Sequence, residues 1–207
     1  MHRLLFLLLV TWVAPAGLAP AQPGELIERT LAIVGLQVIT LSDARVAIRL
    51  GLVDVDRATD PMAVTQLLVD RELVLREVQR YAPPVPPESA VEARIDEIAK
   101  GLDGSNELAR VLEEAGFTET RLRAWVRDDL RAVTYLAQRF TSASAPTDAE
   151  IAKAYAQQRA EFDRVGATVE QAAVQLRERL AVSRRRELIA DWISDLRRRT
   201  EVVIVAQ

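Results

Sequence analysis

The chain has 207 residues, a formal net charge of −3 and no cysteine. Its mild acidity gives no support for nucleic-acid binding, and without cysteine no disulfide can form, so packing must stabilise the fold. The single histidine is His2, so the rest of the chain lacks Ser-His and Cys-His nucleophiles and the usual zinc ligands.

The first residues have the layout of a secretory signal peptide. Arg3 gives a positive start, residues 4–13 form an apolar run, and small residues precede a candidate cleavage site between Ala21 and Gln22. No cysteine follows the apolar run, as a lipid-anchored lipoprotein would require. The pattern predicts export to the periplasm.

Two alternatives concern the same segment. Cleavage after Ala14–Ala16 also fits the small-residue rule. An uncleaved membrane anchor is the weaker interpretation, because Pro15 interrupts an apolar run much shorter than the roughly 20 residues of a membrane span. We expect residues 1–21 to be removed and residues 22–207 to form one domain with no stable membrane anchor.

A short β-hairpin is expected next. Residues 30–34 and 38–40 are strand-like runs rich in β-branched side chains, and Gly35 punctuates them. Thr40 or Ser42 can then cap the first helix.

Helices follow as far as residue 140. Asp60 as N-cap and Pro61 at the first helical position mark the start of one helix. The run 83–87 is read as a stiff turn between helices rather than as a polyproline ligand. Ser105 is expected to cap another helix that closes at Gly116. Apolar residues at helical spacing then predict a long helix over residues 122–140.

Two capped helices and a strand are expected to complete the chain. Thr147 and Glu150 form a capping-box pattern, and Thr168 is the expected cap of a closing helix that extends to residue 199. Residues 201–205 read as a strand, and pairing it with the N-terminal strand would remove an exposed edge. The predicted class is therefore mainly α, with an N-terminal hairpin paired to a C-terminal strand.

No group of polar side chains predicts catalysis, so we expect no catalytic residue, metal or cofactor. Asp128 and Asp129 are adjacent, and neighbours on a helix do not face each other, so they are not a catalytic dyad. We interpret them as a solvated helix edge.

The hairpin resembles the opening of SurA-like periplasmic chaperones and parvulin-type foldases. There a "VVNGEVIT-x-SD" segment leads into the first helix, and "IVGLQVITLSD" (residues 33–43) is similar to it. The matching positions are Val38, Ile39, Thr40, Ser42 and Asp43. Gly35-Leu36 replaces the family's Asn-Gly, which leaves the turn type open.

Three further segments resemble the family in the same order. They are "AVTQLLVDRELVLREVQR", "TDAEIAKAYAQQRAEF" and the closing "TVEQAAVQLRERLAVSRRRELIADWISDLRRRTEVVI". Helical periodicity is common, so each segment alone is weak, but the ordered set covers nearly all of residues 26–206. The resemblance implies a core similar to the SurA N-terminal domain.

The resemblance also implies that a module is missing. In the family, the parvulin isomerase module usually follows the segment that ends here at Phe162, whereas in this chain Thr168 begins the closing helix almost at once. The resemblance therefore implies a non-catalytic chaperone of unfolded exported proteins, above all outer-membrane β-barrel precursors. Prolyl isomerase activity is the less favoured alternative.

Aromatic side chains are the candidate client contacts, and core packing is the alternative for each. The candidates are Phe117, Trp125, Tyr135, Phe140, Tyr155, Phe162 and Trp192. A third hypothesis is an envelope scaffold that binds one folded partner through the arginines of the closing helix. A solvated face balanced by nearby carboxylates is the favoured interpretation of those arginines. The sequence leaves client identity and oligomeric state open.

Overall fold

The computed structural model describes residues 28–53 and 61–205. This part of the chain is mainly helical, with one small sheet, as the sequence predicts. The elements in chain order are β1 (Thr30–Val34), β2 (Gln37–Thr40), α1 (Leu41–Arg49), α2 (Pro61–Tyr81), α3 (Glu88–Lys100), α4 (Ser105–Glu114), α5 (Glu119–Phe140), α6 (Asp148–Val165), α7 (Val169–Arg199) and β3 (Val202–Ile204). The expected signal peptide, its cleavage site and the Asp60 cap lie outside the described residues.

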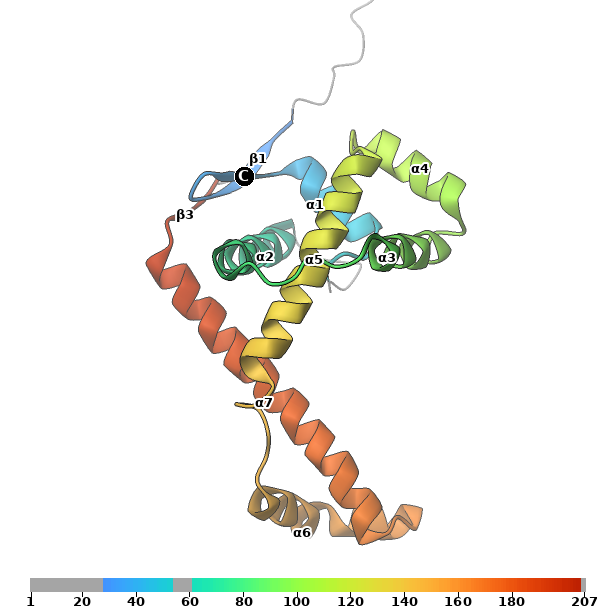
Figure 1. Cartoon of the computed structure of the whole chain (residues 1–207), viewed down its shortest axis with the longest axis vertical. Coiled ribbons are helices and arrows are strands. Elements are labelled where there is room, and N and C mark those ends of the chain that lie inside the picture. Colours follow the sequence, from blue (N-terminus) through green and yellow to red (C-terminus); the bar gives the residue numbers. More distant parts are fainter. Residues whose placement is uncertain (1–27, 54–60, 206–207) are drawn as a thin grey trace, which may run out of the picture.

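The three strands form an antiparallel sheet in the order β2-β1-β3. Ile33 of β1 lies opposite Val38 on one side and Val203 on the other. The C-terminal strand therefore pairs with the N-terminal strand, which confirms the prediction made from the exposed edge. Figure 1 shows β1 and β3 side by side at one end of the molecule.

Gly35 determines the type of the hairpin turn. Gly35 has a φ of 60°, whereas Leu36 keeps a negative φ, as in a type II′ turn that takes glycine at its first central position. The Gly35 N–H donates to the Glu201 carbonyl at 3.0 Å. Arg76 of α2 donates to the Val34 carbonyl at 3.2 Å, so the turn is tied both to the segment before β3 and to the helix beneath it.

The helix ends follow the capping signals with one exception. Thr40, Thr147 and Thr168 each accept a hydrogen bond from the third residue of their helix, and each forms a capping box. The prediction for Ser105 is wrong by one position, because Gly104 is the N-cap and Ser105 is the first helical residue. The Phe117 N–H donates to the Leu112 carbonyl at 2.8 Å, which closes α4 as predicted.

Most of the described residues form a head, which we define as residues 28–53, 61–140 and 188–205. One apolar cluster lies between the sheet, α2, the C-terminal half of α5 and the end of α7. A second cluster is shared by α1, α3, α4 and the N-terminal half of α5. Trp125 of α5 contacts both clusters, so α5 joins the two halves of the head.

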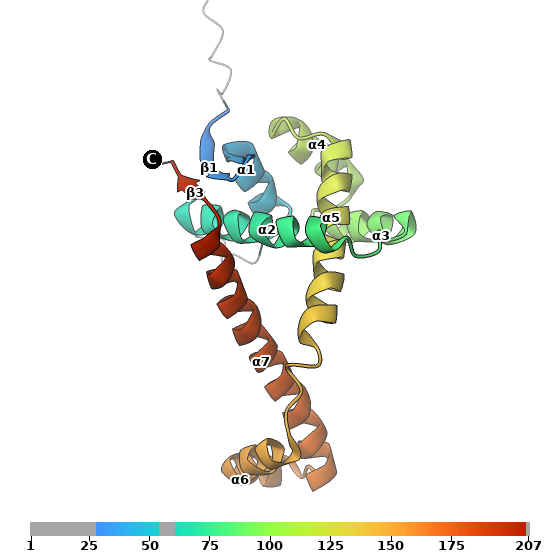
Figure 2. The same ribbon diagram turned by 60° about the vertical axis from the view of Figure 1, so that its left-hand side comes forward.

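The remaining helices form an arm, which we define as residues 148–180. There α6 packs against the first half of α7 around a separate cluster of Ile151, Ala154, Phe162, Ala172 and Leu176. Figures 1 and 2 both show the arm projecting away from the head, with α7 running through both parts. Among the described residues, no helix is long and apolar enough to cross a membrane.

Candidate functional site

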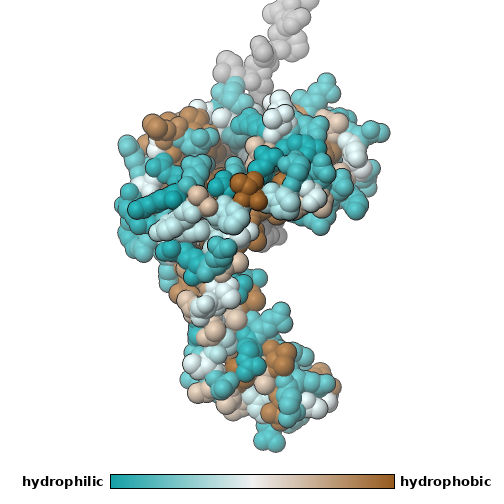
Figure 3. Space-filling model, viewed as in Figure 1, coloured by the Kyte–Doolittle hydropathy of each residue, from teal (hydrophilic) through white to brown (hydrophobic). Residues whose placement is uncertain are grey.

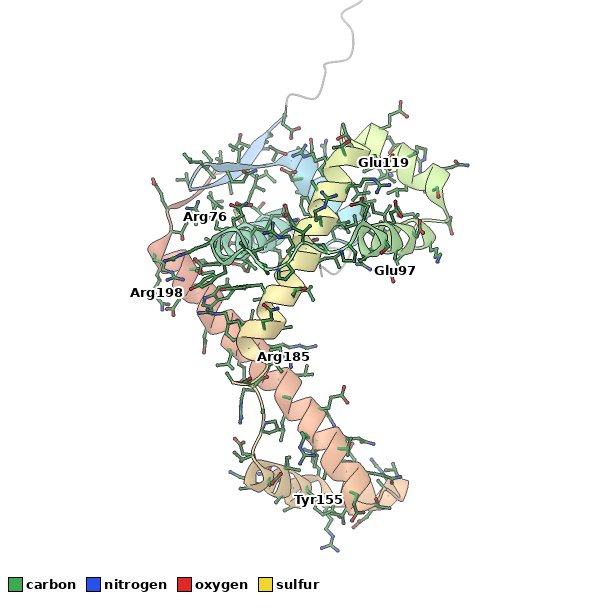
Figure 4. The ribbon with its side chains drawn as sticks, in the orientation of Figure 1. Arg76, Glu97, Glu119, Tyr155, Arg185 and Arg198 are labelled. Atoms are coloured by element: carbon green, nitrogen blue, oxygen red, sulfur yellow. The ribbon has the colours of Figure 1, made fainter. Side chains whose placement is uncertain are left out.

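The seven aromatic candidates do not form one surface. Phe117 and Trp125 meet edge to face at 6.2 Å, while Tyr135 and Phe140 surround Trp192 at 5.9 and 5.6 Å. Tyr155 stacks on Phe162 at 6.0 Å in the arm. Figure 4 shows Tyr155 far from the head residues Arg76 and Glu119.

Burial separates these candidates further. Phe117, Tyr135, Phe140, Phe162 and Trp192 are buried, whereas Trp125 and Tyr155 are partly buried. In this conformation the buried five pack the clusters of the head and arm, which is the alternative considered for each from the sequence. These buried side chains therefore do not form a surface for a partner in this conformation. The partly buried Trp125, in contrast, lines a groove.

A groove of about 220 Å³ opens beside β2, between α2 and α5; we call it the β2 groove. Its lining residues are Gln37, Val38, Ile39, Asp43, Leu68, Arg71, Glu72, Leu75, Gln79, Arg121, Ala124, Trp125 and Asp128. The strand forms one wall, and the two helices supply apolar side chains together with charged groups.

The strand wall is an open sheet edge. Val34 and Gln37 flank the two-residue turn as a hydrogen-bonded pair, so Ile33 and Val38 form the next, non-hydrogen-bonded pair. The Val38 N–H and C=O therefore point off the β2 edge, away from β1. In the part of the chain that the structure describes, no strand pairs with this edge.

The apolar part of the lining comes from Leu68, Leu75 and Trp125. The Arg71 guanidinium lies over the Trp125 ring at 3.8 Å, and its Nη2 donates to the Trp125 carbonyl at 3.2 Å. Arg71 Nε also donates to Asp129 Oδ1 at 2.7 Å. These contacts hold the indole at the boundary between the groove and the two clusters of the head.

A second ion pair fixes the end of the groove near α1. Arg121 donates to Asp43 Oδ1 at 2.7 Å, and its guanidinium lies 4.5 Å from the Phe117 ring centroid. The other oxygen of Asp43 accepts from the Thr40 N–H at 2.9 Å in the capping box of α1. The turn from β2 into α1 is thereby tied to α5 across the groove.

The acidic residues Asp128 and Asp129 correct the sequence interpretation. Asp129 is partly buried and paired, so it does not belong to a solvated helix edge, whereas the side chain of Asp128 is 39% exposed. Asp129 pairs with Arg71, and burial raises the pKa of its carboxyl despite that cation. Asp128 lines the β2 groove. The spacing in the sequence could have indicated this position. Trp125 precedes the two residues by three and four positions, which places all of them on one face of the same helix.

Glu72 of α2 is the third carboxylate that lines the groove, after Asp43 and Asp128. Burial raises the pKa of its carboxyl, Arg71 and Arg76 lower it, and Asp128 raises it again. Sequence reasoning missed Glu72 because helical periodicity does not say which helix a polar residue will meet.

No protein-family model matches the chain, and no curated protein matches it. Within the described ranges, no group of three or more His, Cys, Asp and Glu residues is placed to hold a metal ion. The geometry of the β2 groove itself must carry any functional argument.

An exposed apolar face adjoins the groove. On the outer side of the sheet, Val38 and Val203 flank Ile33 and are 42% and 47% exposed, while Leu36 at the turn is 99% exposed. In Figure 3 hydrophobic residues gather at the corner of the head where the sheet lies. An extended polypeptide beside β2 would meet open backbone groups on its edge and apolar side chains around it.

Proposed function

We propose that this protein is a non-catalytic periplasmic chaperone that holds unfolded exported proteins, above all outer-membrane β-barrel precursors. The observation that carries the proposal is the unpaired edge of β2 beside a groove whose lining combines apolar side chains with charged ones. The resemblance to SurA-like chaperones and the expected signal peptide support the compartment and the class of client.

The proposed client and the β2 edge both carry backbone groups that lack hydrogen-bond partners, with apolar side chains beside them. An unfolded β-barrel precursor in water exposes alternating apolar residues and unpaired backbone groups, both of which promote aggregation. A strand added to β2 would satisfy backbone groups through Val38 and place alternate side chains toward Leu75 and Trp125. Holding a chain in this way requires surface complementarity and no bond chemistry.

The scaffold alternative depends on arginines of α7, and several of these are already engaged within the chain. Arg197 donates to Asp70 at 2.6 Å, and Arg184 pairs with Glu150 and donates to the Ala145 carbonyl at 3.0 Å. Figure 4 shows the neighbouring Arg185 where α7 passes between head and arm. The contacts within the chain favour structural roles for Arg184 and Arg197 over contacts with an acidic partner.

The test uses protein purified after export. Light scattering of a urea-diluted outer-membrane β-barrel protein is followed with and without it, beside an inert helical protein of similar charge. We expect aggregation to be suppressed at near-stoichiometric ratios. Failure to suppress aggregation of several barrel proteins would contradict the proposal, and binding to one folded envelope protein instead would favour a scaffold.

A proline variant tests the strand edge directly. Val38→Pro removes an N–H that points off the edge, so no hydrogen bond to β1 is lost. We expect it to weaken client binding about fivefold, the size of a lost backbone hydrogen bond together with a poorer fit.

Two controls bracket this variant. Val38→Thr keeps the donor and the β-branched shape, and Val202→Pro places the same change on the outer edge of β3. Both are expected to bind as the parent does, with circular dichroism showing that the helices are kept. If Val202→Pro weakened client binding as much as Val38→Pro does, the loss would not be specific to the β2 edge, and the proposed binding at that edge would be contradicted.

A further inference from the structure

The β2 groove carries two carboxylates whose side chains accept no hydrogen bond among the described residues. Glu72 has no hydrogen bond or ion pair among the described residues, and Asp128 has Arg131 at a distance of 3.7 Å. The two come from different helices, α2 and α5, and both line the groove. Both carboxylates therefore present negative charge to the groove.

The cations of the groove are already used. Arg71 is held by Asp129 and by the Trp125 ring, and Arg121 is held by Asp43 at 2.7 Å. Each of these pairs is close to neutral as a unit. Arg76 lowers the pKa of the Glu72 carboxyl and Arg131 lies 3.7 Å from Asp128, yet neither cation donates a hydrogen bond to these carboxylates, so their oxygens remain open to a further donor.

We propose that the β2 groove selects extended polypeptide segments that carry a lysine or arginine, whose cationic end lies at Glu72 and Asp128. This inference rests on the proposed function and adds the chemistry of the bound segment. The strand edge specifies an extended backbone, and the acidic pair specifies the charge of one side chain that faces the groove.

The lining suits a long basic side chain. Its aliphatic stem can lie along Leu75 and Trp125 while its charged end reaches the carboxylates, as amphipathic side chains commonly do. Hydrogen bonds to a partly desolvated carboxylate are among the stronger ones in water. In a strand, alternate side chains face the same side, so a basic residue between apolar ones on alternate positions fits best.

The experiment uses fluorescent nine-residue peptides with alternating valine and threonine, identical except at the central position. That position is lysine, norleucine or glutamate, and binding to the protein purified after export is measured by anisotropy at pH 7 and low salt. We expect the lysine peptide to bind about tenfold more tightly than the norleucine peptide, and the glutamate peptide to bind more weakly than either.

Two variants assign the preference to this place. Glu72→Gln combined with Asp128→Asn is expected to reduce the preference for the lysine peptide over the norleucine peptide to less than about twofold. Glu178→Gln removes an exposed carboxylate of the arm and is expected to change nothing. A preference for lysine that survives in the double variant would overturn the assignment.

The remaining outcomes separate this inference from the proposed function. Equal affinity for the three peptides, with aggregation still suppressed, overturns the charge selection and leaves the chaperone proposal standing. If no peptide binds and no client is protected, both are overturned.

Discussion

Gly35 and Arg76 show how closely one residue of this fold depends on another. A side chain at Gly35 would place its Cβ 2.0 Å from Arg76 Nη1, and the φ of 60° already disfavours any residue but glycine. The turn thus needs glycine for two independent reasons. Both act on the hairpin that supplies the open edge of β2.

We expect Gly35→Ala to destabilise the protein by about 2–3 kcal/mol, because backbone strain adds to the displacement of Arg76 from the Val34 carbonyl. Urea unfolding followed by circular dichroism measures this. Gly166→Ala is the control: its φ is 67° with open space around the Cβ, so it should cost only about 1–2 kcal/mol. Equal losses of stability in the two variants would show that Arg76 moves aside without a cost in free energy.

Glu72 gives a prediction with a definite sign in pH. Because burial raises the pKa of its carboxyl, the unfolded chain loses this proton at a lower pH than the folded chain does. The folded state is therefore penalised as pH rises through that interval, and the penalty is complete above the folded pKa.

Glu72→Gln is accordingly expected to raise the urea midpoint at pH 7 by a small amount and to leave it unchanged at pH 3. Unfolding curves of parent and variant at the two pH values check this. A gain of the same size at both pH values would attribute the effect to packing rather than to ionisation. A stable variant also means that lost peptide binding cannot be ascribed to unfolding.

Among the elements, the start of α6 is tied to the middle of α7. Glu150 accepts from the Thr147 N–H at 2.7 Å and pairs with Arg184. The Thr147 backbone, then Arg184 and the Thr147 hydroxyl, lower the pKa of Glu150 to about 2. The bonds are complete above the usual pKa of 4.5 and are lost as pH falls toward about 2.

We therefore expect the amide proton of Thr147 to shift with a midpoint near pH 2 in NMR titrations, because that proton is bound to the Glu150 carboxylate. In Glu150→Gln this transition should disappear. A midpoint near 4.5 in the parent protein would show that neither the cap nor Arg184 holds the carboxylate in solution.

The elements themselves were largely predictable from sequence. The capping residues Thr40, Thr147 and Thr168 act within four residues of themselves, so their pattern identifies the helix starts directly. The turn at Gly35 and the cap at Gly104 were less clear, because glycine permits several backbone conformations.

The β2 groove was not predictable in the same way. Its walls come from β2, α2 and α5, and periodicity says which face of a helix is buried but not which partner covers it. Trp125 was singled out, yet Arg71 and Glu72 of the same groove were not, and Asp128 was interpreted as part of a solvated helix edge. The pairing of β3 with β1 could be foreseen because an unpaired strand has few other partners in a helical chain.

Across the whole molecule, the separate cluster of the arm predicts separate unfolding. Phe162 is 2% exposed and packs with Ala172 and Leu176, with no share in the clusters of the head. In Figure 3 the molecule is narrower between the head and the arm than in either part. Units with their own core commonly open independently.

We expect Phe162→Ala to destabilise the arm by about 3 kcal/mol, because it leaves a cavity where a buried ring was. Hydrogen exchange should then accelerate in α6 and remain unchanged in α2. Leu73→Ala, at a buried position of the head, should instead accelerate exchange in α2. Faster exchange throughout the head in Phe162→Ala would show that head and arm unfold together.

The place of β3 in the sheet has a consequence for the biosynthesis of this protein. The hairpin of β1 and β2 emerges early, but its third strand follows only after Arg199, so β1 stays unpaired on one side until almost all of the described chain has been made. Throughout that interval the nascent protein exposes an open strand and apolar side chains. It therefore needs the same protection from aggregation that we propose it gives to other proteins once it is folded.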